Sequence, residues 1–315
     1  MLVGDGAAPA VSVVMVLWNA APFLEGCIAA LEQSGVRVEV LCVDNASTDG
    51  SAALAERLGC SVERSASNVG FPAAVNRVLP QCQAPITLLL NPDVELEPEA
   101  LELALDELAV EGVGMVGANL RRRDGTPDPP AARRFRSVGT ILVESVGLPR
   151  LWRRLDLQYF PSWDRTTSRD VPCINGAFML VPTSTLRALG GLDESVFLYL
   201  EDQELCRSVA ERRERIRFAA RARATHVGGG STEASSQEQR AAAYLHRLDA
   251  SLEIVRRRQG DHARRAALLT LLGRSGSQWI LAVFSGDAGR RLKHREALRW
   301  LAQQWARRRP PPPVP

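Results

Sequence analysis

Along the first half of the chain, short apolar runs alternate with segments whose apolar residues recur every three or four positions. A short apolar run is typical of a strand buried on both faces of a sheet, whereas a 3.6-residue period is typical of an amphipathic helix. The runs predict strands at Val11–Leu17, 38–43, Ile86–Leu90 and 113–120, and a short third strand is expected at Ser61–Arg64. The periodic segments predict helices at 21–31, at 51–58, from about Pro72, and at 98–110. This alternation predicts an α/β fold with a Rossmann-like, mostly parallel sheet flanked by helices.

The pattern is less regular after residue 120. The segment RRRDGTPDPPAARRF is rich in arginine and proline and predicts an exposed loop, and residues 137–170 follow no clear period. Regular patterns return with strand-like runs at 175–181, 196–200 and 218–226, and with helices from Thr183 and from about residue 201 to Arg212. Residues 11–235 are therefore predicted to form one α/β domain, after a flexible N-terminus at residues 1–10.

The last part of the chain, from about Ser236, has a helical composition. Its two apolar blocks, 266–272 and 279–284, are separated by the sequence GRSGSQ, which makes this region too broken to span a bilayer. The flanking arginines and tryptophans suit helices that lie at a membrane surface, and helices packed on the α/β domain are the alternative; the sequence leaves both open. It predicts a basic helical extension at 236–306 and an Arg- and Pro-rich tail at 307–315.

Composition adds a charge asymmetry to this picture. With 315 residues and 45% hydrophobic content, the chain can bury a full core and is globular. From Arg240 to the end, 16 Lys plus Arg stand against 5 Asp plus Glu, and upstream 23 stand against 31, so a body of net −8 precedes a tail of net +11. Such a tail suggests an anionic partner such as a membrane surface, although a solvated helix face is the simpler alternative. The tail contains no recognisable nucleic-acid-binding module, so we expect no nucleic-acid partner.

The cysteines and the N-terminus bear on the compartment. The six cysteines are scattered, with no CxxC pair and no Cys/His cluster at zinc spacing, so buried free thiols are expected. The first ten residues lack a basic region followed by a long apolar stretch, and no later run reaches about 18 apolar residues. The sequence therefore predicts a cytoplasmic protein that is neither exported nor integral, with peripheral contact to the inner face of the plasma membrane as an open alternative.

Two strands of the predicted sheet end in polar residues. The segment LCVDNASTDGS ends a strand at Asp44, and ITLLLNPDV ends another before Asn91 and Asp93. Because the carboxyl ends of parallel strands meet at one edge of a sheet, these side chains are expected to lie at a common ligand-binding edge.

Contacts to a nucleotide are expected from the first two strand ends. Trp18, followed by Asn19, offers a flat face on which a base could stack, with a core aromatic as the alternative. Asp44 could accept a hydrogen bond from the imide N–H of uracil or thymine. Three residues after it could bind ligand or serve only as turn and cap residues: Asn45, Ser47 and Asp49.

The segment SNVGFPAAVN runs from a loop into a predicted helix. Its Asn68, Gly70 and Phe71 would lie at the helix N-terminus, where backbone N–H groups suit contact with phosphate or ribose. A plain loop-to-helix junction is the alternative for this segment.

Taken in order, these segments resemble the family 2 inverting glycosyltransferases with the GT-A fold, and within them the rhamnosyltransferase-like branch. The resemblance runs from about Val11 to His226 and rests on VSVVMVLWN, VDNASTDGS, NVGFPAAVN, LLLNPDV, NGAFMLVPTSTLRALGGLDESVFLYLEDQELC and a late histidine. It implies that residues 11–235 form a GT-A glycosyltransferase domain. The family usually has tyrosine where this chain has Trp18, a change that keeps the stacking face.

The resemblance implies a metal site. Asn91-Pro92-Asp93 matches the family's DxD motif, with asparagine in place of the first aspartate, and His226 matches its C-terminal metal ligand. Asp93 and His226 would then hold Mg²⁺ or Mn²⁺, weakly without donor, and the cation would neutralise charge on the diphosphate leaving group. A structural role is the alternative for His226.

The resemblance also implies a catalytic base. Glu201-Asp202 matches the family's ED motif, and inversion by direct displacement needs one carboxylate to remove the proton of the acceptor hydroxyl. Asp202 is assigned that role and Glu201 would orient it or bind acceptor, with an acidic first helical turn as the alternative. The residues expected to line the acceptor pocket or to cover a phosphate are Gly176, Ala177, Arg133, Arg134 and Phe135.

The function that the resemblance implies is metal-dependent transfer of rhamnose from dTDP-rhamnose to a glycan or lipid-linked acceptor, in bacterial cell-envelope polysaccharide synthesis. The residues themselves indicate only a pyrimidine nucleotide, a metal and a base. The alternatives are the same chemistry with a UDP-hexose donor, a non-catalytic nucleotide-sugar-binding protein, and a nucleotidyltransferase. The last typically has a glycine-rich phosphate loop near its first strand, which this sequence lacks.

Overall fold

The computed structural model describes two compact units of the chain. The described residues are 8–137, 139–141, 160, 163–227, 236–306 and 311; the expected flexibility of residues 1–7 and most of the expected tail at 307–315 lie outside them. We call 8–134, 163–197 and 201–227 the sheet unit. The helical unit comprises 135–137, 139–141, 160, 198–200, 236–306 and 311.

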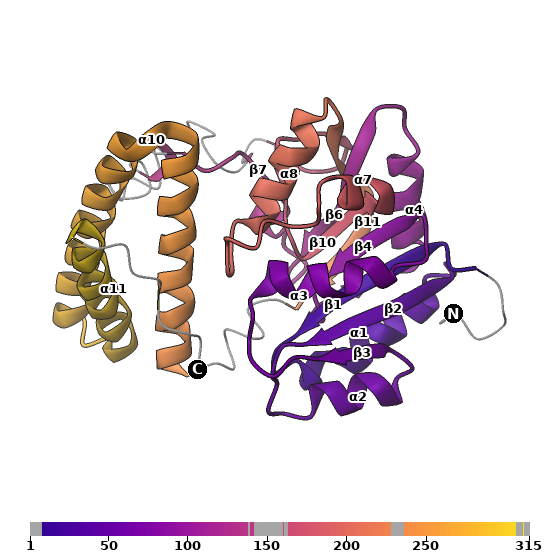
Figure 1. Cartoon of the computed structure of the whole chain (residues 1–315), viewed down its shortest axis with the longest axis horizontal. Coiled ribbons are helices and arrows are strands. Elements are labelled where there is room, and N and C mark those ends of the chain that lie inside the picture. The colour runs from indigo at the N-terminus through magenta and orange to yellow at the C-terminus, as the bar shows by residue number, and fades with distance from the viewer. Residues whose placement is uncertain are drawn as a thin grey trace. The chain divides into compact units, whose positions relative to one another are not determined.

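A curled sheet, nine-stranded within the described residues, forms the centre of the sheet unit (Figure 1). Its strands lie in the order β3-β2-β1-β4-β10-β6-β11-β5, with β8 beside β11. Neighbours pair in parallel except that β10, β5 and β8 run antiparallel to theirs, so the predicted mostly parallel α/β sheet is confirmed. The bounds are β1 Val11–Leu17, β2 Val38–Asp44, β3 Ser61–Arg64, β4 Ile86–Leu90, β5 Val94–Leu96, β6 Val113–Arg121, β8 Arg169–Asp170, β10 Phe178–Pro182 and β11 Arg215–His226. A separate antiparallel pair joins β7 Ala132–Arg133 to β9 Cys173–Ile174.

Helices flank this sheet and bury one face each. In α1 the residues Leu24, Cys27, Ile28 and Leu31 are buried, at the spacing of one helix face. Burial of a leucine or isoleucine side chain contributes about 1.5–3 kcal/mol, so this face is enough to hold the helix on the sheet. The helix bounds are α1 Ala21–Gln33, α2 Ser51–Arg57, α3 Phe71–Val78, α4 Ala100–Leu108, α7 Thr183–Ala188 and α8 Glu201–Glu211, with 3-10 turns η1 Leu79–Gln81 and η2 Pro129–Ala131.

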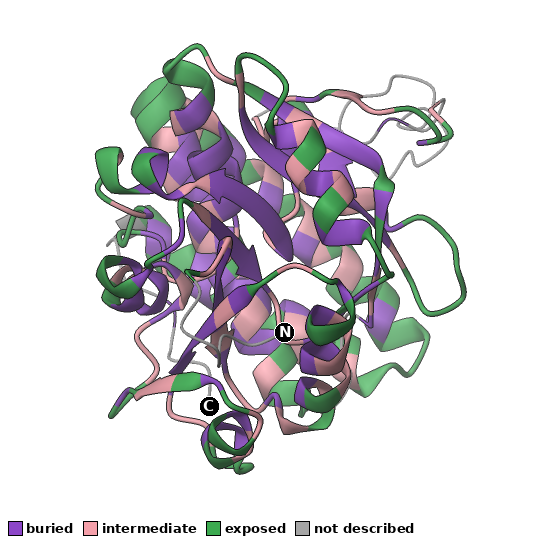
Figure 2. Ribbon diagram, turned by 90° about the vertical axis from the view of Figure 1, so that its right-hand side faces the viewer, coloured by how far each residue is buried: buried purple, intermediate pink, exposed green. Residues whose placement is uncertain are grey.

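The core of the sheet unit lies in the strands themselves. All residues of β1 are buried except Val16, which is partly buried, as expected for a central strand covered on both faces. Figure 2 shows the same pattern, with strands largely buried and exposed positions on the outer turns of helices and in loops. The six cysteines are buried and free, as the sequence predicted.

The run at 196–200 is not a strand, contrary to the sequence prediction. Tyr199 and Leu200 have φ angles of 70° and 68°, in the left-handed region that an extended strand does not contain. The apolar residues form a turn instead, in which Val196 and Leu200 are buried. A buried turn and a short buried strand need the same apolar composition, and this explains the error.

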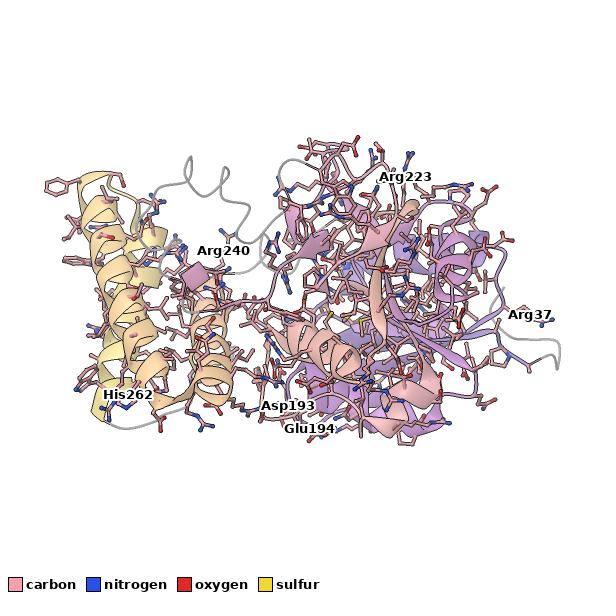
Figure 3. The ribbon with its side chains drawn as sticks, turned by 90° about the horizontal axis from the view of Figure 1, so that it is seen from above. Arg37, Asp193, Glu194, Arg223, Arg240 and His262 are labelled. Carbon is pink, nitrogen blue, oxygen red and sulfur yellow. The ribbon has the colours of Figure 1, made fainter. Side chains whose placement is uncertain are left out.

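Two long helices, α10 Gln237–Phe284 and α11 Ala288–Ala306, make up most of the helical unit (Figure 1). Ser236 caps α10: its hydroxyl accepts the Gln239 N–H at 3.2 Å, and Gln239 Oε1 accepts the Ser236 N–H at 2.9 Å. Gly260, with φ of 84°, bends α10, so Arg240 and His262, labelled in Figure 3, belong to different segments of it. One core joins both segments to α11: Ile141, Tyr244, Leu245, Leu248, Leu252, Val255, Ala267, Leu268, Leu271, Ala297, Trp300 and Leu301.

The GRSGSQ sequence lies inside α10 and does not interrupt it. Each glycine costs a helix about 1 kcal/mol relative to alanine, but Leu271 and Ala282 on either side are buried and hold the segment. The two apolar blocks therefore form one continuous helical segment. By length and composition alone, α10 meets the minimum for a membrane-crossing helix, a test that core helices of globular proteins also meet.

Candidate active site

The ends of β1 and β2 meet because the two strands are parallel neighbours. Leu17 is opposite Asp44 in the register, so Trp18 and Asn45, which follow them, come to the same edge of the sheet. Asp44 and Asn45 are buried, and Trp18 is partly exposed. The Asp44 carboxylate accepts a long hydrogen bond, 3.4 Å from the Ser47 N–H, and keeps acceptor capacity for a ligand.

Asn19, Ser47 and Asp49 connect the loops that follow β1 and β2. The Asn19 N–H donates to Ser47 Oγ at 3.0 Å, and the Ala21 N–H donates to Asp49 Oδ2 at 2.9 Å. Partial burial raises the pKa of Asp49, but hydrogen bonds from the Ser51 hydroxyl and from backbone N–H groups bring it below its usual value. Because Ser47 and Asp49 already bind backbone groups, the geometry favours the turn-and-cap alternative for them.

Asn45 and Asn68 hold the loop before α3. Asn45 Nδ2 donates to Asn68 Oδ1 at 2.8 Å, and Asn45 Oδ1 accepts the Val69 N–H at 2.8 Å. Asn68 Oδ1 also accepts the Gly70 N–H at 3.0 Å. The two amides therefore fix one loop against the end of β2.

The start of α3 is closed by a backbone contact. The Phe71 N–H donates to the Phe197 carbonyl at 2.9 Å. Gly70 has φ of 87°, and a Cβ there would lie 2.5 Å from the same carbonyl oxygen, so only glycine fits. Since the N–H groups of Val69, Gly70 and Phe71 all donate within the protein, the contacts favour a loop-to-helix junction over a phosphate site.

The two residues expected to hold a metal lie together because β5 and β11 pair. β5 starts immediately after Asp93, and its antiparallel partner β11 ends at His226, so that His226 Nε2 lies 3.5 Å from Asp93 Oδ1. The Val227 N–H donates to the Asp93 carbonyl at 2.9 Å and fixes this register. Asn91 follows β4, where its N–H donates to the Ala177 carbonyl at 3.0 Å.

Asp128 lies at the other nitrogen of the His226 ring, with its Oδ2 3.3 Å from Nδ1. Burial lowers the pKa of His226, but the hydrogen bonds and charges of Asp128 and Asp93 outweigh it and raise the pKa to about 9. A carboxylate behind a metal-binding histidine is common, because it fixes the ring orientation and the tautomer.

Asp93 and His226 fit a divalent cation as two of its ligands. In the part of the chain that the structure describes, no group of three or more His, Cys, Asp or Glu side chains could hold a metal ion. Mg²⁺ and Mn²⁺ need more ligands than two, so the donor diphosphate and water must supply the rest. A cation must also displace the proton that His226 shares with its carboxylates. The residues therefore fit a cation that binds together with the donor.

Asp202 lies buried in the first turn of α8. Its Oδ2 accepts the Gly176 N–H at 3.0 Å and pairs with Arg133 Nη2, and its Oδ1 accepts the Gln203 N–H at 2.7 Å. The β7–β9 pairing positions Arg133. A Cβ at Gly176 would lie 3.2 Å from the Asp202 Cβ, so a larger residue would displace the carboxylate. Arg134 is exposed, and Phe135 belongs to the helical unit.

Glu201, the residue before Asp202, has a strongly raised pKa. Burial and the negative charge of Asp202 raise the pKa of Glu201 to about 8, although Arg133 opposes this effect. Its Oε2 is buried and has no hydrogen-bond partner among the described residues. The raised pKa favours the protonated form of Glu201 near neutral pH.

Asp128 is absent from the residues that the sequence predicted for the site, and its segment was expected to be an exposed loop. The structure corrects this, since Asp128 is buried together with Ala131 of η2. The buried Arg165 holds the turn: its Nη2 donates to the Pro129 carbonyl at 2.9 Å, and its Nη1 donates to the Asp128 carbonyl. Arg165 is distant in sequence, so no local pattern could have revealed the contact.

Comparison with known proteins identifies a family. Residues 12–180 match the model for Glycosyl transferase family 2. Over 210 residues the chain is 30% identical to the N-acetylglucosaminyl-diphospho-decaprenol L-rhamnosyltransferase of Mycobacterium tuberculosis, in strains CDC 1551 / Oshkosh and ATCC 25618 / H37Rv. This similarity covers 61% of the chain and 68% of the relative.

Solved structures share the fold at low identity. The mannosyltransferase PcManGT from Pyrobaculum calidifontis, in complex with GDP-Man and Mn²⁺, matches with a TM-score of 0.55 and 17% identity, covering 96% of this chain and 89% of that one. TarS 1–349 of S. aureus matches with a TM-score of 0.51 and 12% identity, covering 94% and 91%. GalNAc-T7 with UDP, GalNAc and Mn²⁺ matches with a TM-score of 0.55 and 14% identity, and the match covers 96% of this chain and 57% of that one. The family model covers more than half of the chain, and the protein belongs to glycosyltransferase family 2 and has the GT-A fold.

Proposed function

We propose that this glycosyltransferase moves rhamnose from dTDP-rhamnose to a lipid-linked glycan acceptor in bacterial cell-envelope polysaccharide synthesis. Support for the sugar and the acceptor comes from the name of the Mycobacterium tuberculosis relative, an L-rhamnosyltransferase of N-acetylglucosaminyl-diphospho-decaprenol. The observation that carries the proposal is the buried Asp202 carboxylate at the start of α8, held by Gly176 and Arg133.

In this proposal the donor nucleotide binds at the ends of β1 and β2. Asp44 is buried with acceptor capacity left, which suits the imide N–H of thymine or uracil. Trp18 is partly exposed at the same edge and provides a ring on which the base can stack. The hydrogen bonds of Ser47 and Asp49 keep the loops after β1 and β2 in place. Ser47 and Asp49 therefore affect donor binding indirectly, because they fix the positions of Asp44 and Trp18.

Asp202 acts as the general base. It takes the proton of the acceptor hydroxyl while that oxygen bonds to the anomeric carbon, and the bond from that carbon to the diphosphate breaks on the opposite face. The configuration inverts because one displacement occurs. Arg133 and the Gly176 N–H orient Oδ2, and the absence of a side chain at Gly176 allows its backbone to lie close to the carboxylate. Glu201 in its protonated form, which its raised pKa favours, can donate a hydrogen bond to the acceptor.

Asp93 and His226 would hold Mg²⁺ or Mn²⁺, with Asp128 fixing the imidazole. When bound, the cation supplies Lewis acidity that stabilises the negative charge of the departing diphosphate. Asn91 replaces a carboxylate in this ligand set, so the protein attracts the cation less strongly on its own. The donor diphosphate must therefore contribute to cation binding.

A UDP-hexose donor is the second candidate. Uracil and thymine present the same imide N–H, so Asp44 and Trp18 would accept either base. The choice of sugar depends on a few contacts in the pocket, and the sugar assignment rests on the relative alone.

A lipid-linked acceptor would also place the enzyme in the cytoplasm as a peripheral protein of the inner membrane face.

Calorimetric titration with dTDP-rhamnose, UDP-glucose, UDP-galactose and GDP-mannose, each with Mn²⁺ and again with EDTA, tests the proposal. We expect dTDP-rhamnose to bind most tightly, and to bind more weakly in EDTA. Tighter binding of a UDP-hexose would transfer the proposal to that donor. Tighter binding of GDP-mannose, or binding indifferent to EDTA, would contradict the roles given to Asp44 and to the Asp93–His226 pair.

A further inference from the structure

The second segment of α10 has an apolar outer face. Most of the large hydrophobic side chains that are exposed in the described residues lie here, and they are between 38% and 86% exposed. We call them the apolar face: Leu269, Trp279, Ile280, Leu281, Val283 and Phe284. Leu269, Ile280 and Phe284 are 11 and 4 residues apart in sequence, which places them along one side of the helix.

The opposite side of this segment packs into the core of the helical unit. Ala267, Leu268 and Leu271 belong to that core, and Ala282 is buried. Arg274 is the one charged residue in the sequence from 266 to 284. A surface helix of a water-exposed domain normally has a polar outer face, so an apolar outer face opposite a buried one needs a partner.

Arginines border the apolar face in sequence. Arg265 is exposed just before it, and Arg290 and Arg291 are exposed after the turn that follows Phe284. The partly exposed Trp279 adds an amphipathic ring of the kind that lies at the boundary between lipid and water. An apolar strip with cationic ends is complementary to a membrane surface that carries negative headgroups.

We propose that the apolar face binds the surface of an anionic lipid bilayer, with the second segment of α10 lying in the headgroup region. A spanning orientation is disfavoured because it would remove Leu268 and Leu271 from the core of the helical unit. A second copy of the chain is disfavoured as the partner, because each copy brings a net charge of +11 from Arg240 onward and the copies repel. This proposal rests on the proposed function in one respect: a lipid-linked acceptor lies at a membrane and gives the enzyme a reason to bind there.

Vesicle sedimentation with full-length protein tests this surface. Vesicles of phosphatidylcholine with 30% phosphatidylglycerol, a probe composition of about the charge of an anionic membrane, are compared with phosphatidylcholine alone. The double variant Ile280→Ser/Phe284→Ser removes two exposed side chains of the apolar face. Val110→Ser, which changes an exposed apolar residue of the sheet unit, is the matched control.

We expect the wild type and Val110→Ser to bind anionic vesicles alike, and the double variant to bind at least about tenfold more weakly. Circular dichroism must show the same helix content in all three proteins. Equal binding by the double variant and the wild type, or no binding by the wild type, would overturn the proposal. Light scattering that showed a wild-type dimer, lost in the double variant, would assign the apolar face to a second copy instead.

Salt and donor titrations separate the possible failures. Binding that partly survives high salt supports an inserted apolar face, whereas complete loss would assign the attraction to the arginines alone and overturn the role of the apolar face. Donor affinity, measured by calorimetry on the same proteins, is expected to be unchanged in the double variant. Failure of donor binding in the wild type would contradict the proposed function and leave the vesicle result standing.

Discussion

The loops after β1 and β2 and the start of α8 both contain carboxylates and amides, but they use them differently. On the donor side, Asn45, Ser47 and Asp49 bind other loop groups, so most polar atoms there hold the backbone in place. On the proposed base side, Asp202 is paired with Arg133, and the partly buried Glu201 beside it has its pKa raised to about 8. The polar groups after β1 and β2 thus mainly hold loops in place. At the start of α8, by contrast, a well-bonded Asp202 lies beside Glu201, whose Oε2 has no hydrogen-bond partner among the described residues, and such an acid pair suits acid–base chemistry.

The largest expected effect comes from the base side. Asp202→Asn should lower kcat by at least about a hundredfold, because the amide cannot take the acceptor proton, while donor affinity stays near normal. Initial rates at saturating donor and acceptor measure this. Asp170→Asn, which removes an exposed acid that pairs with Arg215, is the matched control and should keep kcat.

The same experiment distinguishes loss of the catalytic base from loss of the fold. If Asp202→Asn retained near-normal turnover, Asp202 would not be the base. If both variants lost activity together with their near-UV circular dichroism signal, the cause would be misfolding. Single-turnover rates on the folded fraction would then decide whether Asp202 is the base.

The next effect concerns the group behind His226. Asp128→Asn should weaken Mn²⁺ binding in the presence of dTDP about 10- to 100-fold, since the carboxylate on Nδ1 orients the imidazole. Electron paramagnetic resonance titration of free Mn²⁺ measures the affinity without turnover. Asp124→Asn alters an exposed carboxylate of the same loop, which binds Thr126, and should leave the affinity unchanged. Equal affinities in the wild type and Asp128→Asn would remove Asp128 from the metal site.

Glu201 gives a pH signature of the base side. Its pKa is 4.5 in a model peptide and about 8 in the folded protein, so between these values only the folded protein retains the proton. Protonation of Glu201 therefore stabilises the folded protein. This contribution is complete below about pH 4.5 and is lost as pH rises towards 8. Glu201→Gln lacks this proton equilibrium and should gain about 1–2 kcal/mol relative to the wild type between pH 5 and 8. Urea unfolding at the two pH values measures the gain, and a constant difference would refute the assigned charge state.

The smallest effect is expected on the donor side, at Ser47. Ser47→Ala removes the acceptor of the Asn19 N–H and should cost about 1 kcal/mol of unfolding free energy, with kcat within about twofold. Thermal unfolding and initial rates on one preparation measure both quantities. A hundredfold loss of kcat would show that Ser47 contacts ligand, and the contrast between the two sides would then fail.

The order of the motifs along the sequence predicted much of this fold. Buried strands are recognisable from short apolar runs, and the polar residues that end them predict where the sheet edge lies. The turn at 196–200 was predicted as a strand because both bury apolar residues, and the left-handed conformations of Tyr199 and Leu200 left no mark in the hydrophobic pattern. In α10 the sequence predicted a break where the structure has a regular helix, because packing of Leu271 and Ala282 overrides the glycines of GRSGSQ.

The candidate site was only partly predictable for the same reason. The family resemblance paired Asp93 with His226, but the hydrophobic pattern alone could not, because their proximity depends on the pairing of β5, a three-residue strand that no period predicts. Asp128 is buried because Arg165 binds its turn, although the Arg- and Pro-rich composition around it indicates exposure. Local composition reports the average environment of a segment, whereas these contacts depend on tertiary pairing.

The most direct test compares one variant on the proposed donor side with one on the proposed base side. The measurement is kcat and donor dissociation constant for Asp202→Asn and Asp44→Asn, with dTDP-rhamnose and Mn²⁺. We predict that Asp202→Asn loses kcat and keeps donor affinity, and that Asp44→Asn binds donor about tenfold more weakly with kcat nearly unchanged, because it loses a charge-assisted hydrogen bond to the base. The opposite pattern, or the same pattern in both variants, would contradict the division between donor binding and base catalysis.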